Sequence, residues 1–259
     1  MFYHNINPIL LKLGPIEIRY YGLIYALGFV ITYFFLIKLS KERQIDLKKE
    51  DLIDLIFYLI IGVVAGARLF YVLFYNLPYF IENPLIVFAV WQGGLSFHGA
   101  LVGAALIAAW FCKKHKIKFY QLADMIVIPA ALALMLGRIA NFINGELVGR
   151  ITNVPWCVNF EGYEGCRHPS QLYESFKNLV IFAILWTIKD KKINNKKLPD
   201  GFLFWLFVML YSTFRFIIEF WRAPDSQLGF IIFGLTMGQL LCLAMFVVGA
   251  IFMIKIFKK

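Results

Sequence analysis

Long apolar stretches alternate along the chain with short polar connections. A helix needs about 20 mostly apolar residues to cross the hydrocarbon core of a bilayer. The pattern predicts seven such helices, at residues 20–38, 52–75, 94–112, 122–143, 171–188, 202–221 and 232–255. We therefore expect an all-α polytopic membrane protein, with residues 1–259 forming a single integral membrane domain that no long polar linker divides.

The composition supports a membrane protein. The chain is 61% hydrophobic and 16% charged, against about 25% charged residues in a soluble domain. The first 19 residues include His4, Asn5, Asn7 and Glu17 and contain no apolar core or small-residue cleavage site. We therefore expect no cleavable signal peptide.

The net charge of +10 reflects lysines placed in alternate connections. Positively charged loops stay on the cytoplasmic side, so the N-terminus is predicted outside and the C-terminus inside. This accounts for the charge without a nucleic-acid partner, and we expect none. The basic residues of these connections are Lys38, Lys41, Arg43, Lys48 and Lys49; Lys113, Lys114, Lys116 and Lys118; Lys189, Lys191, Lys192, Lys196 and Lys197; and Lys255, Lys258 and Lys259.

Arginines are distributed differently from lysines. The guanidinium fork binds phosphate or carboxylate at two points, whereas the lysine ammonium is a hydrated point charge. The arginines therefore indicate recognition of an anion. Non-specific pairing with lipid head groups is the alternative, which suits Arg19 and Arg167 better than Arg138, Arg215 or Arg222. Apart from Arg43, the arginines lie in the predicted spans or toward the outer side: Arg19, Arg68, Arg138, Arg150, Arg167, Arg215 and Arg222.

A polar cluster ends the fourth apolar window. Arg138, Asn141, Asn144, Glu146 and Gly149 follow the apolar run closely. Such groups are expensive at the membrane edge, so they form a candidate functional site. The structural alternative is an arginine that extends to the interface beside a glycine-rich helix end.

A second polar series ends the sixth window. Tyr211, Arg215, Glu219 and Arg222 have the spacing i, i+4, i+8 and i+11, which places them on one face of a helix. They could form a self-satisfied ladder that only fixes helix packing. One carboxylate between two arginines, however, leaves a net positive charge. Together with Arg138 on the same side, this charge predicts one pocket for a lipid phosphate.

The segment before the third window supplies a candidate base. His98 lies at the mouth of that span, where a histidine can accept a proton near neutral pH. An interfacial histidine bonded to backbone is the alternative. Gly99 and Gly103, four residues apart, favour close helix packing.

Residues 144–170 are predicted to form a small head on the outer face. Cys157 and Cys166 lie within it, and a disulfide and a free pair remain equally open alternatives. Cys112 and Cys242 suit a role as small apolar side chains.

Several known chemistries are missing from the sequence. There is no His-Glu-x-x-His helix, no Gly-x-x-x-x-Gly-Lys loop and no Gly-x-Ser-x-Gly turn. The histidines are too scattered to suggest a metal site, and we expect no cofactor. If the protein is an enzyme, its nucleophile comes from a substrate.

Taken together, these segments resemble the bacterial prolipoprotein diacylglyceryl transferases. The resemblance covers most of the chain and is most specific over 137–150, where Ala140 replaces the usual glycine. The other matching segments are 93–99, 168–174 (His-Pro-Ser-Gln-Leu-Tyr-Glu) and 215–225. The resemblance implies transfer of a diacylglyceryl group from phosphatidylglycerol to the thiol of a prolipoprotein lipobox cysteine, at the outer leaflet of the bacterial cytoplasmic (inner) membrane. Glycerol phosphate is released.

The residue pattern fits this reaction. We expect Arg138 and Arg215 to hold the phosphate, where they would stabilise the leaving group. The base is His98, Glu146 or none, because an electropositive pocket alone raises the thiolate fraction. The expected head-group residues are Asn141, Asn144 and Gly149, with Glu219 and Arg222 orienting Arg215, and with Tyr21 and Tyr211 reaching the pocket.

Two other classes remain open. A flippase or transporter for anionic lipids also needs arginines at the membrane edge. It predicts polar residues through the cytoplasmic halves of the spans, which are nearly all apolar. A lipid-binding structural protein is the third class.

Overall fold

The computed structural model describes residues 2–14, 16–193, 196–224, 229–232 and 234–258. Asp225, the last residue of one matching segment, lies outside the described residues. The chain divides into two compact units, which are described separately. Unit 1 comprises residues 1–32 and 124–259, and unit 2 comprises residues 33–123.

Each of the seven predicted windows contains a long helix. The helices are α1 (Tyr20–Glu42), α2 (Lys49–Tyr75), α4 (Phe97–His115), α5 (Phe119–Ile143), α6 (Ser170–Ile188), α7 (Phe202–Ile218) and α8 (Met237–Phe257). Among the described residues, α1, α2, α5 and α8 are long and apolar enough to cross a membrane. The chain therefore fits a polytopic membrane protein. The number of spans and their orientation remain predictions.

Two helices are shorter than the windows that predicted them, and the structure shows a cause for each. α7 ends at Ile218 because the following residues turn, and Arg222 pairs with Gly149 in a β-bridge. α8 begins at Met237 because the Thr236 hydroxyl caps it by accepting a hydrogen bond from the backbone N–H of Gln239.

Short strand pairs join the helices, which an all-α prediction did not include. β1 pairs with β4 in parallel, and the other three pairs are antiparallel. The strands are β1 (Phe2–His4), β2 (Ile9–Leu13), β3 (Ile16–Arg19), β4 (Val158–Phe160), β5 (Lys192–Ile193), β6 (Lys196–Lys197), β7 (Phe230–Ile232) and β8 (Leu235–Thr236).

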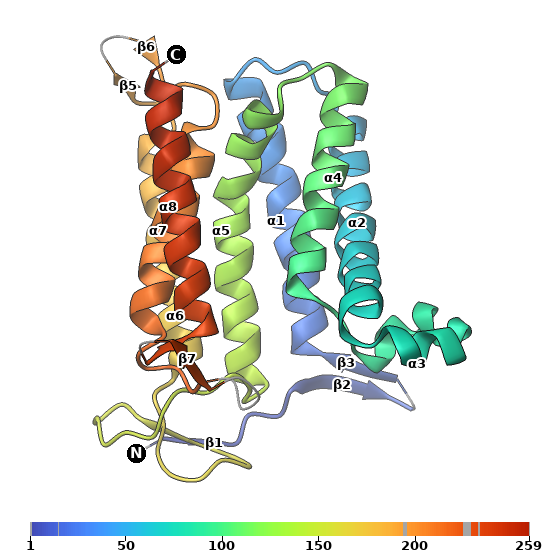
Figure 1. Cartoon of the computed structure of the whole chain (residues 1–259), viewed down its shortest axis with the longest axis vertical. Helices are drawn as coiled ribbons and strands as arrows, with labels where there is room; N and C mark the ends of the chain where they lie inside the picture. Colours follow the sequence, from blue (N-terminus) through green and yellow to red (C-terminus); the bar gives the residue numbers. More distant parts are fainter. Residues whose placement is uncertain (1, 15, 194–195, 225–228, 233, 259) are drawn as a thin grey trace. The chain divides into compact units, whose positions relative to one another are not determined.

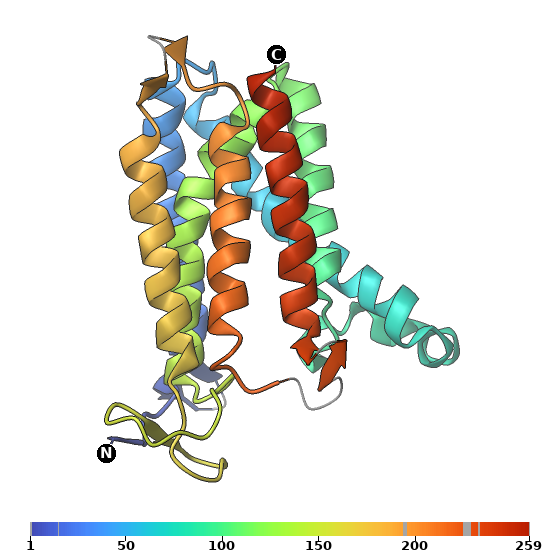
Figure 2. The same ribbon diagram turned by 60° about the vertical axis from the view of Figure 1, so that its left-hand side comes forward.

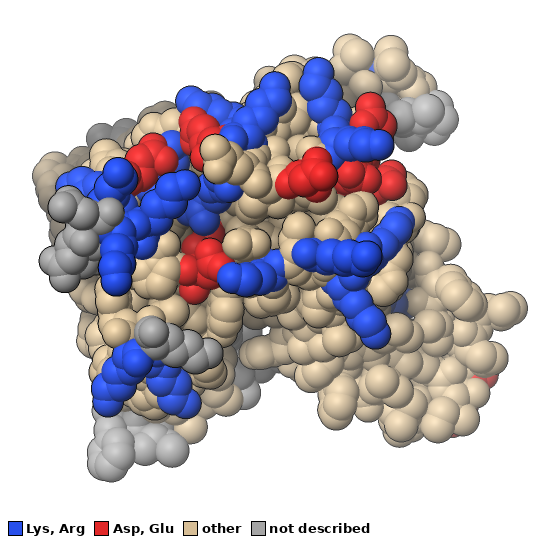
Figure 3. Space-filling model, turned by 90° about the horizontal axis from the view of Figure 1, so that it is seen from above, with Lys and Arg blue, Asp and Glu red and all other residues tan. Residues whose placement is uncertain are grey.

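In unit 1, α5 to α8 run side by side (Figures 1 and 2). The Ser175 hydroxyl joins α6 to α5 by donating to the Met135 carbonyl, at 3.2 Å. Asp124 of α5 caps α7, because its carboxylate accepts from the backbone N–H groups of Gly201 (2.9 Å) and Phe204 (2.8 Å). At the helix ends that carry β5 and β6, Lys and Arg side chains gather on the face shown in Figure 3.

The connection between α5 and α6 forms a compact segment with its own small core. Val148, Val158 and Phe160 are buried there and pack with Phe142. A disulfide joins Cys157 to Cys166, with 5.5 Å between their Cα atoms. Of the two alternatives that the sequence left open for these cysteines, the structure contains the disulfide.

Removal of this disulfide is expected to loosen the segment. In the chain-entropy account, a bridge that closes so short a loop contributes roughly 2–3 kcal/mol. We expect Cys157→Ser/Cys166→Ser to lower the thermal midpoint and to increase protease cleavage between residues 150 and 167. The matched control is Cys112→Ser, a buried free cysteine outside the segment, which should not change that cleavage. Equal cleavage of bridged and unbridged protein would contradict this prediction.

In unit 2, α2 and α4 approach each other through glycines. A Cβ on Gly103 would lie 2.0 Å from the Gly62 carbonyl oxygen, and one on Gly99 would lie 2.2 Å from that of Gly66. Only glycine permits these backbones to approach so closely. The predicted close packing of Gly99 and Gly103 is therefore confirmed. Short helices follow α2: α3 (Leu77–Glu82), η1 (Pro84–Phe88) and η2 (Val90–Gln92).

Gly103→Ala is expected to destabilise the protein by about 1–3 kcal/mol, the usual cost of overpacking. The reason is that the opposing atom is backbone, which cannot rotate away. Thermal unfolding in detergent measures the effect. Gly22→Ala is the control, because a Cβ there meets no atom within 4 Å. An unchanged midpoint for Gly103→Ala would contradict the close packing.

Arg68 of α2 has a structural role. Its guanidinium is buried and donates to the carbonyls of Ile86, Val87, Gly93 and Gly94 at 2.6–3.1 Å. These bonds fasten the segment between α2 and α4. The interpretation of arginines as anion-binding residues is therefore wrong for Arg68.

Candidate functional site

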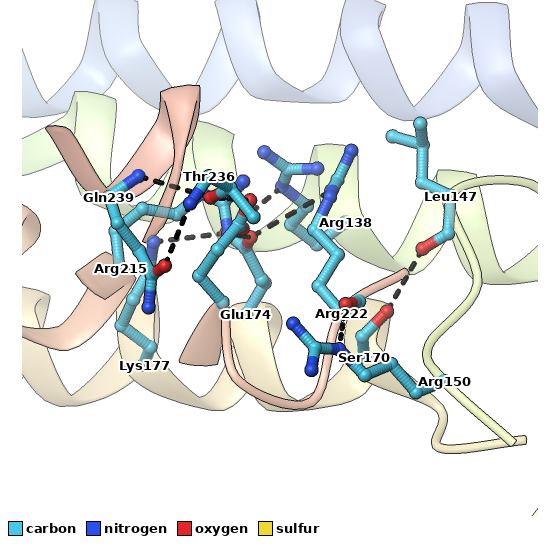
Figure 4. Close-up of polar contacts among 11 residues, drawn as sticks. Arg138, Leu147, Arg150, Ser170, Glu174, Lys177, Arg215, Arg222, Thr236 and Gln239 are labelled. Carbon is cyan, nitrogen blue, oxygen red and sulfur yellow. Dashed lines mark hydrogen bonds and ion pairs between the residues drawn. The ribbon is translucent and has the colours of Figure 1, made fainter. Parts of the chain in front are cut away.

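Four cationic side chains surround one buried carboxylate in unit 1. Glu174 is 1% exposed. The Lys177 Nζ atom lies 3.0 Å from its Oε2 atom, and the Arg138 Nε atom lies 3.5 Å from the same oxygen. Nη1 of Arg215 and Nη1 of Arg222 lie 3.1 Å and 4.0 Å from Oε1. Figure 4 shows these side chains converging on Glu174. We call these five residues, together with Glu219, the arginine cluster.

Separate elements bring these residues together. Arg138 comes from the last turns of α5 and Arg215 from the last turn of α7, whereas Arg222 follows α7. Glu174 and Lys177 lie in the first half of α6, three residues apart and therefore on one face. The N-terminal half of α6 thus lies against the C-terminal ends of α5 and α7.

A second carboxylate holds Arg215 from the other side. The Glu219 side chain accepts a hydrogen bond from Arg215 Nη1. Its other oxygen accepts one from the Thr236 hydroxyl, at 2.9 Å. Thr236 also caps α8, so the position of Arg215 depends on where α8 begins.

The cluster has more positive than negative groups. Three arginines and one lysine oppose Glu174 and Glu219, which leaves a formal excess of two positive charges. Taking charges out of water is costly unless each has a partner. A buried excess of this kind favours an anionic ligand, and a phosphate suits the arginine fork.

Three of the predicted pocket residues lie around Glu146, which is itself a candidate base. Its Oε1 atom accepts from the side-chain amides of Asn141 (2.7 Å) and Asn144 (3.5 Å). Tyr21 is within electrostatic reach of Glu146 and Asn141, and its hydroxyl lies 3.0 Å from that of Tyr25. Asn141 is three residues beyond Arg138 on α5. These polar groups therefore continue from the arginine cluster along one helix face.

Gly149 joins the segment after α5 to the segment after α7. Its N–H donates to the His168 carbonyl at 3.0 Å, and it forms a β-bridge with Arg222. A Cβ on Gly149 would lie 2.4 Å from the His168 oxygen and 2.7 Å from the Trp221 oxygen. The structure thus places Gly149 where two backbones meet. A direct part in the lipid pocket remains a prediction.

The remaining predicted residues are found in different places. Tyr211 lies one turn before Arg215 on α7, and Lys177 Nζ is 3.9 Å from its ring centroid. His98 lies in unit 2, in the first turn of α4, where it is exposed. Its proposed role as a base remains a prediction. Glu219 contacts Arg215 as expected, while Arg222 reaches Glu174.

Sequence reasoning missed Lys177 and gave Glu174 too small a role. Glu174 stood out only as the last residue of the matching segment 168–174, and Lys177 went unnoticed inside an apolar window. A signal was available, because a lysine within a predicted span is expensive and needs a partner. The carboxylate three residues before it supplies that partner.

Three further arginines contact other groups than Glu174. Arg150 Nε donates to the Arg222 carbonyl at 2.9 Å. Arg167 donates to the carbonyls of Glu164 and Gly149, and Arg19 pairs with Glu17. Of the arginines that suggested anion recognition, those that gather in the cluster are Arg138, Arg215 and Arg222.

An apolar cavity of about 590 Å³ lies between the start of α6 and the compact segment that precedes it. The Tyr173 hydroxyl at its edge accepts a hydrogen bond from the Trp156 indole at 2.8 Å and lies 3.0 Å from His168 Nδ1. Burial lowers the pKa of His168, so its imidazole is neutral near pH 7. The cavity is lined by Phe2, Phe142, Pro155, Trp156, Cys157, Val158, Pro169, Leu172 and Tyr173.

Fold and site together define a class: a polytopic membrane protein with a buried cationic cluster suited to an anionic group. Comparison with known proteins defines the family within that class. The model of the family described as prolipoprotein diacylglyceryl transferase matches residues 8–255. The chain belongs to this family.

Similar proteins agree with this assignment. A phosphatidylglycerol–prolipoprotein diacylglyceryl transferase of Geobacter sulfurreducens is 46% identical over 251 residues, which cover 96% of this chain and 95% of the relative. One from Desulfotalea psychrophila is 46% identical, covering 94% and 91%. One from Pseudomonas aeruginosa PAO1 is 42% identical, covering 99% and 96%.

Proposed function

We propose that this protein transfers the diacylglyceryl group of phosphatidylglycerol to the cysteine thiol of a prolipoprotein lipobox. The products are a thioether-linked lipoprotein precursor and glycerol phosphate. Membership of the family and the names of the similar proteins support the reaction. The observation that carries it is the convergence of Arg138 and Arg215, from separate helices, on one carboxylate with two positive charges in excess.

In the proposed reaction, the thiolate sulfur attacks the glycerol carbon that is bonded to the phosphate oxygen. The carbon–sulfur bond forms as the carbon–oxygen bond breaks, and the electron pair of the broken bond passes to the phosphate oxygen. Arg138 and Arg215 would hold the phosphate from opposite sides. Charge develops there in the transition state, where pre-placed cationic donors accelerate reaction most.

The thiol must first lose its proton. A cysteine thiol has an ordinary pKa of about 8.5, and neighbouring cations lower it. His98 remains the first candidate base and Glu146 the second. Glu146 Oε1 already accepts hydrogen bonds from the side-chain amides of Asn141 and Asn144, so it would have to exchange one of them to take up the thiol proton. The cationic field alone is the third possibility.

The proposed setting is the bacterial cytoplasmic (inner) membrane. The protein would cross it seven times as one domain, with the N-terminus outside, the C-terminus inside and residues 144–170 as an outer head. The lysine-rich alternate connections support this orientation. The arginine cluster would then lie toward the outer leaflet, where a prolipoprotein presents its lipobox.

The reaction can be tested with purified protein, phosphatidylglycerol and a lipobox peptide. We expect the mass of one diacylglyceryl group to be added at the peptide cysteine, with one glycerol phosphate released per peptide. A peptide with serine in place of cysteine is the control. Movement of labelled phosphatidylglycerol across vesicles, without any gain in peptide mass, would instead indicate a flippase and contradict the proposal.

A further inference from the structure

Lys177 is buried inside the arginine cluster. Its side chain is 1% exposed, with Nζ 3.0 Å from Glu174 Oε2 and 3.9 Å from the Tyr211 ring centroid. A buried ammonium is costly, and an apolar side chain of similar length would fill the same space. Packing alone therefore does not account for a lysine here.

The charge of Lys177 changes the balance of the cluster. Without it, three arginines oppose Glu174 and Glu219, and the formal excess is one positive charge. With it, the excess is two. Lys177 and Arg138 approach the same oxygen, Glu174 Oε2, at 3.0 Å and 3.5 Å. Lys177 therefore satisfies the carboxylate that would otherwise draw Arg138 closer.

Two excess positive charges match the charge of the phosphate after the carbon–oxygen bond has broken in the proposed reaction. The phosphodiester of phosphatidylglycerol carries one negative charge. When its carbon–oxygen bond breaks, the released phosphate monoester carries about −1.5 to −2 at pH 7. An interaction that strengthens as this charge develops raises kcat, whereas one equally strong with the substrate changes mainly KM.

We propose that Lys177 is a positioning residue that neutralises Glu174, so that Arg138, Arg215 and Arg222 keep two unpaired positive charges for the leaving phosphate. Lys177 acts through Glu174 and does not itself contact the phosphate. This inference rests on the proposed function, because the second negative charge arises only when that bond breaks.

The main test compares Lys177→Met with the parent protein in the lipobox-peptide assay. We expect kcat to fall by at least about tenfold, while KM for phosphatidylglycerol changes by less than about threefold. Lys177→Arg, which keeps the charge, should recover most of kcat. Lys191→Met, the same change at an exposed lysine, should match the parent in both constants.

A double-mutant cycle separates charge balance from packing. Glu174→Gln removes the charge that Lys177 neutralises. In that background we expect Lys177→Met to lower kcat by less than about threefold, because the double variant still has the two excess positive charges of the parent protein. An equal loss in both backgrounds, or a raised KM with unchanged kcat, would overturn the proposal.

If Glu174→Gln is inactive, the cycle cannot be measured, and a binding measurement tests the role of Lys177 instead. Glycerol phosphate, which carries up to two charges, should compete with phosphatidylglycerol for the parent protein. Lys177→Met should weaken competition by glycerol phosphate at least about fivefold more than binding of phosphatidylglycerol. Equal weakening of both would overturn the role of Lys177. Failure of the parent to form any thioether would instead overturn the proposed function, and the binding comparison would still test Lys177.

Discussion

Arg215→Ala is expected to abolish diacylglyceryl transfer, with a loss of about 10²–10³-fold or more. Arg215 lies between Glu174 and Glu219, and in the proposed reaction it also holds the phosphate. Arg138→Ala is expected to have a similar effect, because Arg138 reaches Glu174 from α5. Transfer is measured as the gain in mass at the cysteine of a lipobox peptide, with glycerol phosphate as the second product.

The two variants differ in their expected stability. Arg215→Ala leaves two buried carboxylates short of a partner, and breaking a buried pair in this way costs about 3–5 kcal/mol. Arg138→Ala breaks one contact of 3.5 Å and should fold more normally. Arg138→Lys and Arg215→Lys keep the charge but lose the fork, so we expect intermediate activity. Near-normal turnover by either alanine variant in folded protein would refute the proposed phosphate site.

Gly149→Ala is expected to cause the second-largest loss. A Cβ would lie within 2.7 Å of the His168 and Trp221 carbonyl oxygens, both of which are backbone atoms. The bridge between Gly149 and Arg222 would have to open, which would move Arg222 away from Glu174. We expect a loss of about 3 kcal/mol in stability. Transfer activity should also fall, because Arg222 would no longer be held in the arginine cluster.

The experiment compares the thermal midpoint and the transfer rate of Gly149→Ala with those of the parent. Gly28→Ala is the matched control, because a Cβ there makes an ordinary contact of 3.6 Å with Ala133. Normal stability and activity of Gly149→Ala would show that the two backbone segments can separate without consequence. That result would remove Gly149 from the support of the site.

The helices could be predicted from the sequence because their signal is local. Each apolar window contains a helix, and one error, the early end of α7, lies at an end set by a distant contact. α7 stops early because Arg222 bridges to Gly149, which is far away in the sequence. Strands β1 and β4 were missed for a similar reason, because they pair with each other although more than 150 residues separate them.

The site could be predicted only in part. Arg138 and Arg215 stood out because each ends an apolar window, and the structure places both at Glu174. The central position of Glu174 depends on how α6 lies against α5 and α7, which no local spacing reveals. Arg68 was misinterpreted because its partners are backbone carbonyl groups. Every residue has such a group, so the sequence does not show which of them an arginine will contact.

The carboxylate of Asp124 has a consequence for how the lipid is received. It anchors the start of α7 to α5 about 14 residues, or roughly 20 Å, before the level of Arg138. Helices α5 and α7 are thus held together at one end by Asp124 and at the other by the contacts of Arg138 and Arg215 with Glu174. Contacts at both ends resist sliding and separation of the two helices. The distance between Arg138 and Arg215 should therefore change little when a head group binds, so that binding would not have to rearrange these two helices.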